Sequence, residues 1–403
     1  MHLTLLTQYY PPEVGAPQAR LSELACHFAS AGHSVTVLTA MPNYPLGKIY
    51  PGYGGLLRRE RQARLQIIRT FIYPTQKPSF IARITNYLSF AFSSAVLGSL
   101  LLGRSDYLLV ESPPLFSGLP GAWLSKIKRA RLIFNVSDLW PESAVRLGIL
   151  RSESLAYRLS AWLERFCYRR AWLITGQSKS ILADITKRFP GRSTFHLSNG
   201  VDTVRFRPDR GTEAARALLN GNRRSVVLYA GLHGLAQGLD QVLEAAAAVR
   251  GETGVQFVFI GDGPEKRFLT KRAEEIDLKN VIFLDSRPAK DIPALVAAAD
   301  IIVVPLKMYI PGAVPSKLYE AMASGRPVVL VAEGEAAELV REYQAGIVVE
   351  PGDTHNLVDA IRTLHAQPSL RRALGENGRR AAEQHFDRAK IALRFIKHLE
   401  THL

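Results

Sequence analysis

Cysteine is scarce in this chain: Cys26 and Cys167 are the two among 403 residues. Two cysteines cannot build the disulfide framework of a small secreted domain. The histidines and cysteines also show no cluster with the spacing of a metal-binding motif. We therefore expect a protein of a reducing compartment, the cytoplasm, without a metal site.

Several common catalytic and nucleotide-binding motifs are missing as well. No Gly-Lys-Ser/Thr precedes a predicted helix as in a Walker A loop, and neither a GxGxxG fingerprint nor a GxSxG nucleophile elbow occurs. The stretch that begins at His2 has neither the basic region nor the cleavage pattern of a signal peptide. These absences disfavour hydrolytic and metal-dependent functions and favour a cytoplasmic location.

Acidic residues are too few to balance the basic ones, and the imbalance lies in one half of the chain. The formal net charge is +15; residues 1–200 hold 24 Lys and Arg against 10 Asp and Glu, whereas residues 201–403 hold 27 against 26. The strongly basic first half is typical of a surface that faces nucleic acid or anionic lipid, and charge alone does not choose between them.

No uninterrupted apolar segment reaches the length of a membrane span. Residues 80–102 are largely apolar, but Arg83, Asn86 and four serines interrupt them, and a span needs about 20 apolar residues. We favour a helix that is partly core and partly an apolar surface lying in a membrane interface. A fully buried core helix is the main alternative, and a true membrane span is a weaker one.

A strand–helix rhythm runs through the chain, which with 47% hydrophobic residues can bury a large core. Apolar runs predict strands at residues 2–8, 34–39, 107–111, 132–136 and 173–175, and again at 226–230, 255–260, 281–284, 301–305, 327–332 and 346–350. Intervening helices make these βαβ units of parallel sheets. We expect an α/β fold with domains at residues 1–198 and 199–384, and a last helix at 385–403 that packs back on the first domain.

Residues 311–329 predict a short helix whose N-terminus lies at the carboxyl edge of the second sheet. Ser316 can cap its start, and Gly325 can end it in a left-handed conformation. Free N–H groups, the helix dipole and Lys317 would attract phosphate there. Glu320, one turn further, could accept hydrogen bonds from a ribose. The alternative is an ordinary capped helix with a solvated glutamate.

Other loops at the same predicted edges carry candidate groups. Glycine-bearing loops at residues 231–238 and 261–264 lie at the same predicted edge as the loop before Ser316. Ligands bind at this edge of doubly wound sheets, so the three loops together indicate a nucleotide pocket. His233 lies in the first loop, although a lone histidine is usually structural. In the first domain Asp138, and more weakly Glu142, follow the strand at 132–136.

Six motifs, taken in order, give the chain a resemblance to glycosyltransferase family 4, and in particular to bacterial O-antigen and colanic-acid type transferases. The motifs are Tyr9-Tyr-Pro-Pro-Glu-Val-Gly15, Asp138-Leu-Trp-Pro-Glu-Ser143, Asn199-Gly-Val-Asp202, Tyr229-Ala-Gly-Leu-His-Gly-Leu-Ala-Gln-Gly-Leu239, Gly261-Asp-Gly263 and Pro315-Ser-Lys-Leu-Tyr-Glu-Ala-Met-Ala323. The resemblance spans essentially the whole chain. It implies the GT-B fold, two Rossmann-like doubly wound domains with the active site in an interdomain cleft.

The resemblance also implies roles for individual residues. The second domain would hold a nucleotide-sugar donor, with Glu320 on the ribose and Arg287 in a turn near the base. The diphosphate would lie near Gly15, Val314, Pro315, Ser316, Lys317 and Leu318, and the expected donor-binding set also includes Gly231, His233, Gln237, Gly261 and Gly263. The first domain would receive the acceptor near Asp138 and Glu142. Asp138, Lys317 and Glu320 are the expected catalytic residues.

The sequence departs from the family pattern in three respects, at four positions. Gly312 stands where a second glutamate often lies eight residues before Glu320, and Ser137 replaces a histidine that often precedes Asp138. Leu232 and Gln237 occupy the positions of an arginine and a lysine that neutralise the diphosphate. We therefore hypothesise that Lys317 replaces the lost positive charge.

The resemblance implies retaining transfer of a hexosyl or N-acetylhexosaminyl group from a UDP-sugar to a polyprenyl-diphosphate-linked saccharide, in the biosynthesis of O-antigen, capsule or exopolysaccharide. No metal or other cofactor would be needed. The basic first domain would bind the anionic inner face of the cell membrane, so the protein would be cytoplasmic and peripherally associated. A nucleotide-sugar epimerase of the same fold is the alternative, but it leaves the charge of the first domain unexplained. A nucleic-acid partner is disfavoured because no RNA- or DNA-binding module is recognisable.

Overall fold

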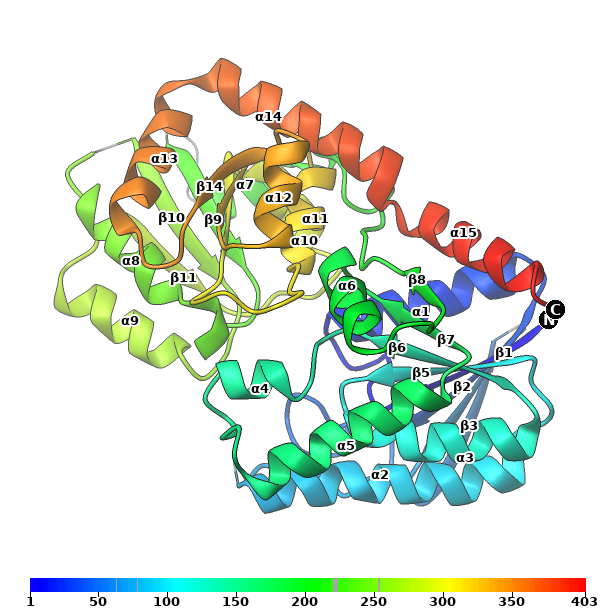
Figure 1. Ribbon diagram of the computed structural model, residues 1–403. Helices are drawn as coiled ribbons and strands as arrows, with labels where there is room; N and C mark the ends of the chain where they lie inside the picture. The colour runs from blue at the N-terminus through cyan, green and yellow to red at the C-terminus, as the bar shows by residue number, and fades with distance from the viewer. Residues whose placement is uncertain (63, 78, 220–223, 253) are drawn as a thin grey trace. The chain divides into compact units, whose positions relative to one another are not determined.

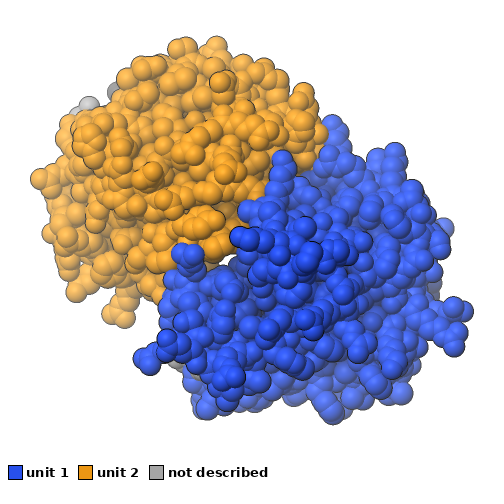
Figure 2. Space-filling model, in the orientation of Figure 1, with its two compact units in different colours: residues 1–199, 388–403 blue, residues 200–387 orange. Residues whose placement is uncertain are grey.

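The chain folds into two compact units, each built around its own sheet (Figures 1 and 2). The computed structural model describes residues 1–62, 64–77, 79–219, 224–252 and 254–403. The first unit comprises residues 1–199 and 388–403, and the second comprises residues 200–387.

The first unit contains an eight-stranded sheet in the order β3-β4-β2-β1-β5-β6-β7-β8. Its pairs are parallel except for the antiparallel pair of β3 and β4. The strands are β1 (His2–Thr7), β2 (Ser34–Ala40), β3 (Leu57–Gln62), β4 (Leu65–Thr70), β5 (Tyr107–Ser112), β6 (Arg131–Val136), β7 (Leu173–Gly176) and β8 (Thr194–His196).

Helices cover both faces of this sheet (Figure 1). They are α1 (Ala16–Ser30), α2 (Phe80–Leu101), α3 (Gly118–Lys128), α4 (Glu142–Arg146), α5 (Leu155–Arg170), α6 (Lys179–Arg188) and α15 (Arg388–Glu400), with a short 3-10 turn η1 (Leu115–Ser117). Successive residues of a strand point to opposite faces. Leu5 therefore belongs to the core that contains Phe28, whereas Leu6 belongs to the core that contains Phe90.

The last helix, α15, is part of the first unit. The Phe395 ring lies 6.0 Å from that of Phe28 and 5.2 Å from that of Phe195, and the Tyr107 hydroxyl donates a hydrogen bond of 2.7 Å to the Leu399 carbonyl. The expected start of this helix at residue 385 is wrong. Residues Ala382–Phe386 form a π-helical turn of the second unit, where Phe386 packs 4.9 Å from the ring of Tyr319.

Helix α2 has one face in the core and one face exposed. Phe90 and Ser94 are buried, whereas Phe92 is 73% and Leu100 75% exposed. Among the described residues it is the one helix long and apolar enough by composition to cross a membrane, and 33% of its most apolar window is buried. Its buried face makes α2 an integral layer of the first unit.

The second unit contains a six-stranded parallel sheet in the order β11-β10-β9-β12-β13-β14. Its strands are β9 (Ser225–Ala230), β10 (Val255–Ile260), β11 (Val281–Leu284), β12 (Ile301–Pro305), β13 (Val328–Val331) and β14 (Gly346–Val349). Its helices are α7 (Glu213–Leu218), α8 (Leu239–Ala248), α9 (Lys266–Glu275), α10 (Ile292–Ala298), α11 (Ser316–Ala323), α12 (Glu335–Glu342), α13 (Thr354–Ala366) and α14 (Pro368–Ala381), with 3-10 turns η2 (Pro208–Arg210) and η3 (Leu235–Gln237).

Strands of this sheet are buried on both faces, as their continuous apolar sequences require. Val226 and Leu228 lie in one core, and Val227 and Tyr229 lie in the other. Because β9 to β13 are parallel, the loops at residues 231–238, 261–264, 285–291 and 306–315 all leave from the carboxyl edge of the sheet. This edge holds the candidate donor site.

Candidate functional site

Helix α11 presents an open N-terminus at this edge. Pro315 is the N-cap and no side chain caps it, so the expected cap by Ser316 is wrong: Ser316 is already the first helical residue. The N–H groups of Ser316 and Lys317 find no acceptor among the described residues. An uncapped helix start carries a partial positive charge.

The other end of α11 is closed as the sequence predicts. Gly325 has a φ of +65°, its N–H donates to the Met322 carbonyl over 3.0 Å, and the N–H of Arg326 donates to the Ala321 carbonyl over 3.1 Å. This is the Schellman arrangement, which needs a residue without a Cβ at the left-handed position. Leu318 is fully buried, so the helix is anchored in the core.

Lys317 extends from the start of α11 across the end of β9. Its Nζ lies 5.4 Å from the centre of the Tyr229 ring, and no hydrogen bond or ion pair to its side chain occurs among the described residues. Burial lowers the pKa of Lys317, while the charge of Glu320 opposes this. Gly231 has a φ of +153°, which other residues rarely adopt, and a Cβ there would also displace the end of the Lys317 side chain.

The loops at residues 231–238 and 261–264 approach each other through their backbones. A Cβ on Gly261 would clash with the Gly231 carbonyl oxygen, and one on Gly263 would clash with the His233 carbonyl oxygen. Both glycines also have φ values, +142° and +153°, that other residues rarely adopt. The N–H of His233 donates to the Asp262 carbonyl over 2.8 Å and joins the two loops.

His233 is fully buried beneath these loops. Its ring packs 5.8 Å from that of Tyr229 and 6.4 Å from those of Phe259 and Phe283, and both ring nitrogens lack a hydrogen-bond partner within the described part of the chain. Burial lowers the pKa of His233 to about 4, and the charge of Lys266 adds to this. The imidazole is therefore neutral at physiological pH, with one N–H to donate and one nitrogen to accept.

The other residues predicted to bind the donor differ in how exposed their side chains are. Glu320 and Gln237 are half-buried, and the Gln237 side-chain oxygen is a buried acceptor without a described partner. Val314 and Leu318 point into the core, so they can offer their backbones alone. Arg287 is exposed, and no described contact connects it to Lys317. The structure thus brings together Gly231, His233, Gly261, Gly263 and Lys317.

The predicted residues of the first unit lie at the carboxyl edge of its own sheet. Gly15 is the N-cap of α1, and no side chain caps that helix. Asp138 follows β6 and accepts a hydrogen bond of 2.9 Å from the Ser143 hydroxyl, and burial raises the pKa of Asp138 to about 6. Glu142 accepts a hydrogen bond of 2.9 Å from the Tyr157 hydroxyl, while its Oε2 is buried without a described partner.

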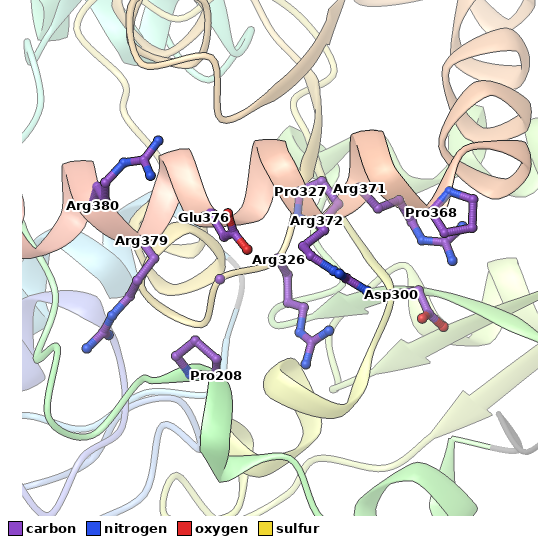
Figure 3. A pocket seen from close by; sticks show the side chains of 11 residues that line it. Pro208, Asp300, Arg326, Pro327, Pro368, Arg371, Arg372, Glu376, Arg379 and Arg380 are labelled. Atoms are coloured by element: carbon purple, nitrogen blue, oxygen red, sulfur yellow. The ribbon is translucent and has the colours of Figure 1, made fainter.

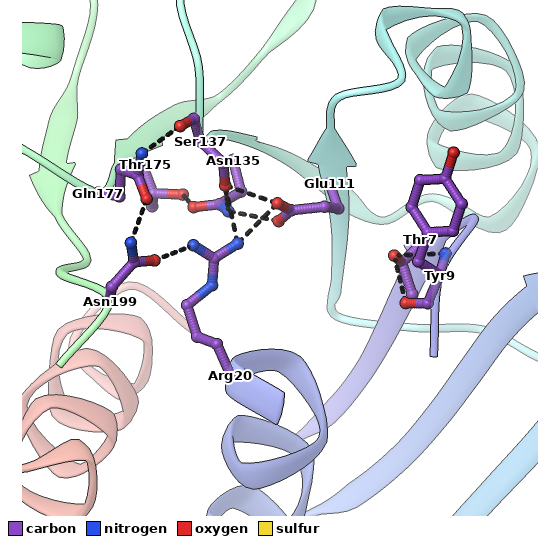
Figure 4. A network of polar contacts seen from close by, with 9 residues as sticks. All are labelled: Thr7, Tyr9, Arg20, Glu111, Asn135, Ser137, Thr175, Gln177 and Asn199. Carbon is purple, nitrogen blue, oxygen red and sulfur yellow. Dashed lines mark hydrogen bonds and ion pairs between the residues drawn. The ribbon is translucent and has the colours of Figure 1, made fainter. Parts of the chain in front are cut away.

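Sequence reasoning missed a buried polar network beside Asp138 (Figure 4). Arg20 of α1 donates to Glu111 Oε1 over 2.6 Å and to the Ser137 hydroxyl over 2.7 Å. The Asn135 side chain donates to Glu111 Oε2 over 2.5 Å, and the Arg20 guanidinium also bonds the Asn199 side chain. The network fixes the ends of β5 and β6 and thereby the backbone that carries Asp138. The feature of the sequence that could have indicated this network is the presence of polar residues within otherwise apolar strands.

No group of three His, Cys, Asp or Glu side chains in the described part of the chain could hold a metal ion.

Comparison with known proteins identifies the fold class. HepE of Anabaena, described as a complex with UDP and glucose, has a TM-score of 0.73 to this structure at 19% identity, and the match covers 100% of both chains. Two Rossmann-like units with parallel sheets define the GT-B fold, as the sequence predicted.

Sequence comparison then identifies the family. The model described as "Glycosyl transferase 4-like domain" matches residues 15–200, and that described as "Glycosyl transferases group 1" matches residues 212–381. A GDP-mannose-dependent alpha-(1-6)-phosphatidylinositol monomannoside mannosyltransferase of Mycolicibacterium smegmatis is 30% identical over 303 residues, 68% of this chain and 79% of that protein. WcaI of Escherichia coli K12, described as a colanic acid biosynthesis glycosyl transferase, is 27% identical over 399 residues, 96% of this chain and 97% of that protein. The chain belongs to glycosyltransferase family 4, as its motifs indicated.

Replacing Asp138 with asparagine should stabilise the protein at neutral pH. Folding raises the pKa of Asp138, so the folded state keeps a proton that the unfolded chain releases, and stability falls as the pH rises from about 4 to about 6. An asparagine side chain cannot ionise, so we expect Asp138→Asn to increase the free energy of unfolding at pH 7 by about 1–3 kcal/mol, from roughly 1.4 kcal/mol per pKa unit. Denaturant unfolding across this pH range measures the difference.

The exposed Glu153→Gln is the matched control, and it should change the stability by less than about 0.5 kcal/mol at every pH. Equal stability of Asp138→Asn and the wild type at pH 7 would contradict the assigned environment of Asp138.

Proposed function

We propose that this chain is a retaining glycosyltransferase that moves a sugar from a UDP-sugar to a polyprenyl-diphosphate-linked saccharide. The acceptor would belong to a cell-surface polysaccharide pathway that makes O-antigen, capsule or exopolysaccharide. The match to WcaI, which covers nearly the whole of both chains, supports a role in polysaccharide synthesis. The observation that carries the proposal is the ammonium of Lys317, which has no described counter-ion at the open start of α11.

A nucleoside diphosphate is the leaving group of such a transfer, and its developing charge needs stabilisation. Lys317, the free N–H groups of Ser316 and Lys317, and the helix dipole supply positive charge at one place. These groups would do this without a metal. Gly231, Gly261 and Gly263 let the backbone approach the diphosphate closely.

Neighbouring groups would orient the rest of the donor. Glu320, one turn into α11, would accept hydrogen bonds from the ribose, and the exposed Arg287 would lie near the base. The neutral His233 and the unpaired oxygen of Gln237 would be satisfied by hydrogen bonds to the donor. The transferred group would be a hexosyl or N-acetylhexosaminyl group.

The first unit would receive the acceptor. Asp138, with its pKa raised to about 6, would orient the reacting sugar, and Glu142 would contribute its unpaired oxygen. Retention would follow from attack on the same face that the leaving diphosphate occupies, assisted by the departing phosphate oxygen.

An apolar stripe on three helices of the first unit supports binding to a membrane. Large apolar side chains are exposed at steps of three, four or seven residues along α2, α3 and α5, which lie along one side of this unit (Figure 1). They are Ile81, Leu88, Phe92, Val96 and Leu100; Leu119, Trp123 and Ile127; Leu155, Leu159 and Trp162. Arg165, Arg169 and Arg170 flank Trp162 and line a hollow with it. Exposed apolar side chains beside basic ones are typical of an interfacial surface. These features support our proposal that the protein is bound peripherally at the cytoplasmic face of the cell membrane.

A panel of donors tests the proposed activity. Purified protein incubated with UDP-, GDP- and dTDP-sugars and a polyprenyl-diphosphate-linked saccharide should release UDP and elongate the lipid-linked product. UDP comes first because HepE was described with UDP, and GDP is included because the Mycolicibacterium relative is described as GDP-mannose-dependent. Isomerisation of the donor without release of nucleotide would instead indicate the epimerase, and no turnover of any donor would refute the proposal.

Replacing Lys317 with alanine should weaken donor binding. A lost charge-assisted hydrogen bond costs about 1.5–3 kcal/mol, so we expect the Kd for the donor to rise by about tenfold or more. The unliganded protein should be no less stable than the wild type, because a partly desolvated charge is removed. Calorimetric titration with the UDP-sugar and thermal unfolding measure the two quantities.

Lys279→Ala, which removes an exposed lysine of the same unit, is the control and should bind the donor normally. An unchanged donor Kd in Lys317→Ala would show that the proposed role of Lys317 is wrong.

Removing apolar side chains from α2 should weaken membrane binding. The double variant Phe92→Ser/Leu100→Ser deletes two highly exposed apolar groups and leaves the buried face of α2 intact. Each such group contributes about 1.5–3 kcal/mol when buried in lipid, so binding to vesicles that contain phosphatidylglycerol should fall at least about tenfold in a flotation assay. Val204→Ser, an exposed site of the second unit, should bind as the wild type does. Equal binding of all three proteins would exclude this surface.

A further inference from the structure

A second basic site lies at the opposite edge of the second sheet. Asp300 precedes β12 and Arg326 precedes β13, so both stand at the amino ends of parallel strands. They line a pocket of about 530 Å³ together with residues of η2 and α14 (Figure 3). β12 is five residues long, which separates the pocket from the Lys317 edge by roughly 16 Å at 3.3 Å per residue.

Arginine dominates the lining of this pocket. Five arginines line it, Arg326, Arg371, Arg372, Arg379 and Arg380, against two carboxylates, those of Asp300 and Glu376. Asp300 Oδ2 already accepts from Arg216 over 2.6 Å and from the N–H of Val226 over 2.8 Å. No ion pair of the described residues joins Glu376 to a lining arginine. The pocket therefore holds an excess of uncompensated positive charge.

Two of the arginines have structural roles. Arg371 donates to the Leu364 and His365 carbonyls at the end of α13. Arg379 donates over 2.7 Å to the carbonyls of Phe206 and Ala323 and pairs with Glu383. These contacts explain why Arg371 and Arg379 are present without invoking a ligand.

Arg326 and Arg372 have no such explanation. The Arg326 side chain is half-buried, its Nε is a buried donor without a partner, and its guanidinium makes no hydrogen bond or ion pair to described residues. Arg372 is exposed near the start of α14 and likewise has no described partner. The unsatisfied buried donor of Arg326 costs free energy. Like charges held close together repel, so a bound anion would stabilise both arginines.

The volume of the pocket and its hydrogen-bond donors indicate which kind of anion it would bind. Guanidinium groups bind phosphate oxygens in a bidentate fork, and the pocket volume lies within the range of sites for small ligands. The start of α14 adds the positive end of a helix dipole, and its N-cap has no side-chain cap. We propose that this pocket binds a soluble small molecule that carries a phosphate or diphosphate group, at a site separate from the donor loops. The assignment does not depend on glycosyl transfer.

Equilibrium dialysis with radiolabelled inorganic pyrophosphate at constant ionic strength tests the site. Lys317→Ala protein, which lacks the proposed diphosphate contact of the donor loops, should still bind pyrophosphate saturably, because Lys317 lies at the other edge of the sheet. Adding Arg326→Gln/Arg372→Gln to it should weaken this remaining binding at least about tenfold, because two charge-assisted contacts are lost. Arg250→Gln, which removes an exposed arginine at the end of α8, should bind like the wild type.

A single variant and a competition with lipid vesicles complete the test. Arg372→Gln alone removes an exposed side chain, so it carries the test if the double variant fails to fold. Unchanged binding in the arginine variants, or loss of all binding in Lys317→Ala, would overturn the proposal. Vesicles that contain phosphatidylglycerol should not displace the pyrophosphate; displacement by them would assign the pocket to a lipid headgroup and overturn the soluble ligand.

Discussion

The ammonium of Lys317 is the constraint on which the donor side of the second unit depends. It lies against the Tyr229 ring and the end of β9, and burial lowers its pKa without a described carboxylate paired to it. A partly desolvated charge costs free energy in the absence of a counter-ion. The loops around it are shaped by its presence, because Gly231 leaves room for the side chain and Gly261 leaves room for the Gly231 carbonyl.

The first unit also contains a buried cation, Arg20, but its role differs from that of Lys317. Arg20 is a structural group, whereas Lys317 is a candidate binding group. The Arg20 side chain is also buried, but Glu111, Ser137 and Asn199 accept hydrogen bonds from its guanidinium. Glu111 compensates the charge of Arg20, and the network fixes strand ends. Ser137 stands where the family pattern often has a histidine, and its hydroxyl is already hydrogen-bonded within this network. Under the proposed function, the acceptor-side chemistry would fall to Asp138, whose carboxylate has one described side-chain partner, Ser143.

The predicted strands of the second unit agree with the structure to within one or two residues, because buried parallel strands are continuous apolar runs. β10, β11 and β12 are found at the bounds that the sequence indicates. The antiparallel pair of β3 and β4 was not predicted, since its sequence is rich in charge. There the buried Arg69 forms an ion pair with Glu60 across the pair, over 2.8 Å. Tertiary context of this kind overrides the local pattern.

The part of the candidate site that could be predicted is the part fixed by the order of strands and helices alone. Parallel strands end at one edge, so the gathering of Gly231, Gly261 and Lys317 followed from the order of elements. Partners far apart in sequence did not follow: Arg20 and Glu111 are 91 residues apart, and neither belongs to a motif. The uncapped start of α11 also escaped prediction, because whether a serine is the N-cap or the first helical residue depends on one residue of register.

The two basic sites of the second unit meet the two ends of the same short helix. α11 has eight residues, about 12 Å at 1.5 Å per residue, with Lys317 at its start and the Ala323 carbonyl bound by Arg379 at its end. Cations at a helix C-terminus are favourable, so Arg379 stabilises α11 whether or not the pocket is filled. Leu318, Ala321 and Met322 are fully buried, and a close-packed helix does not shift by small continuous steps. An anion at one end can therefore alter affinity at the other through electrostatics or a discrete repacking of α11, and either effect has to be reciprocal.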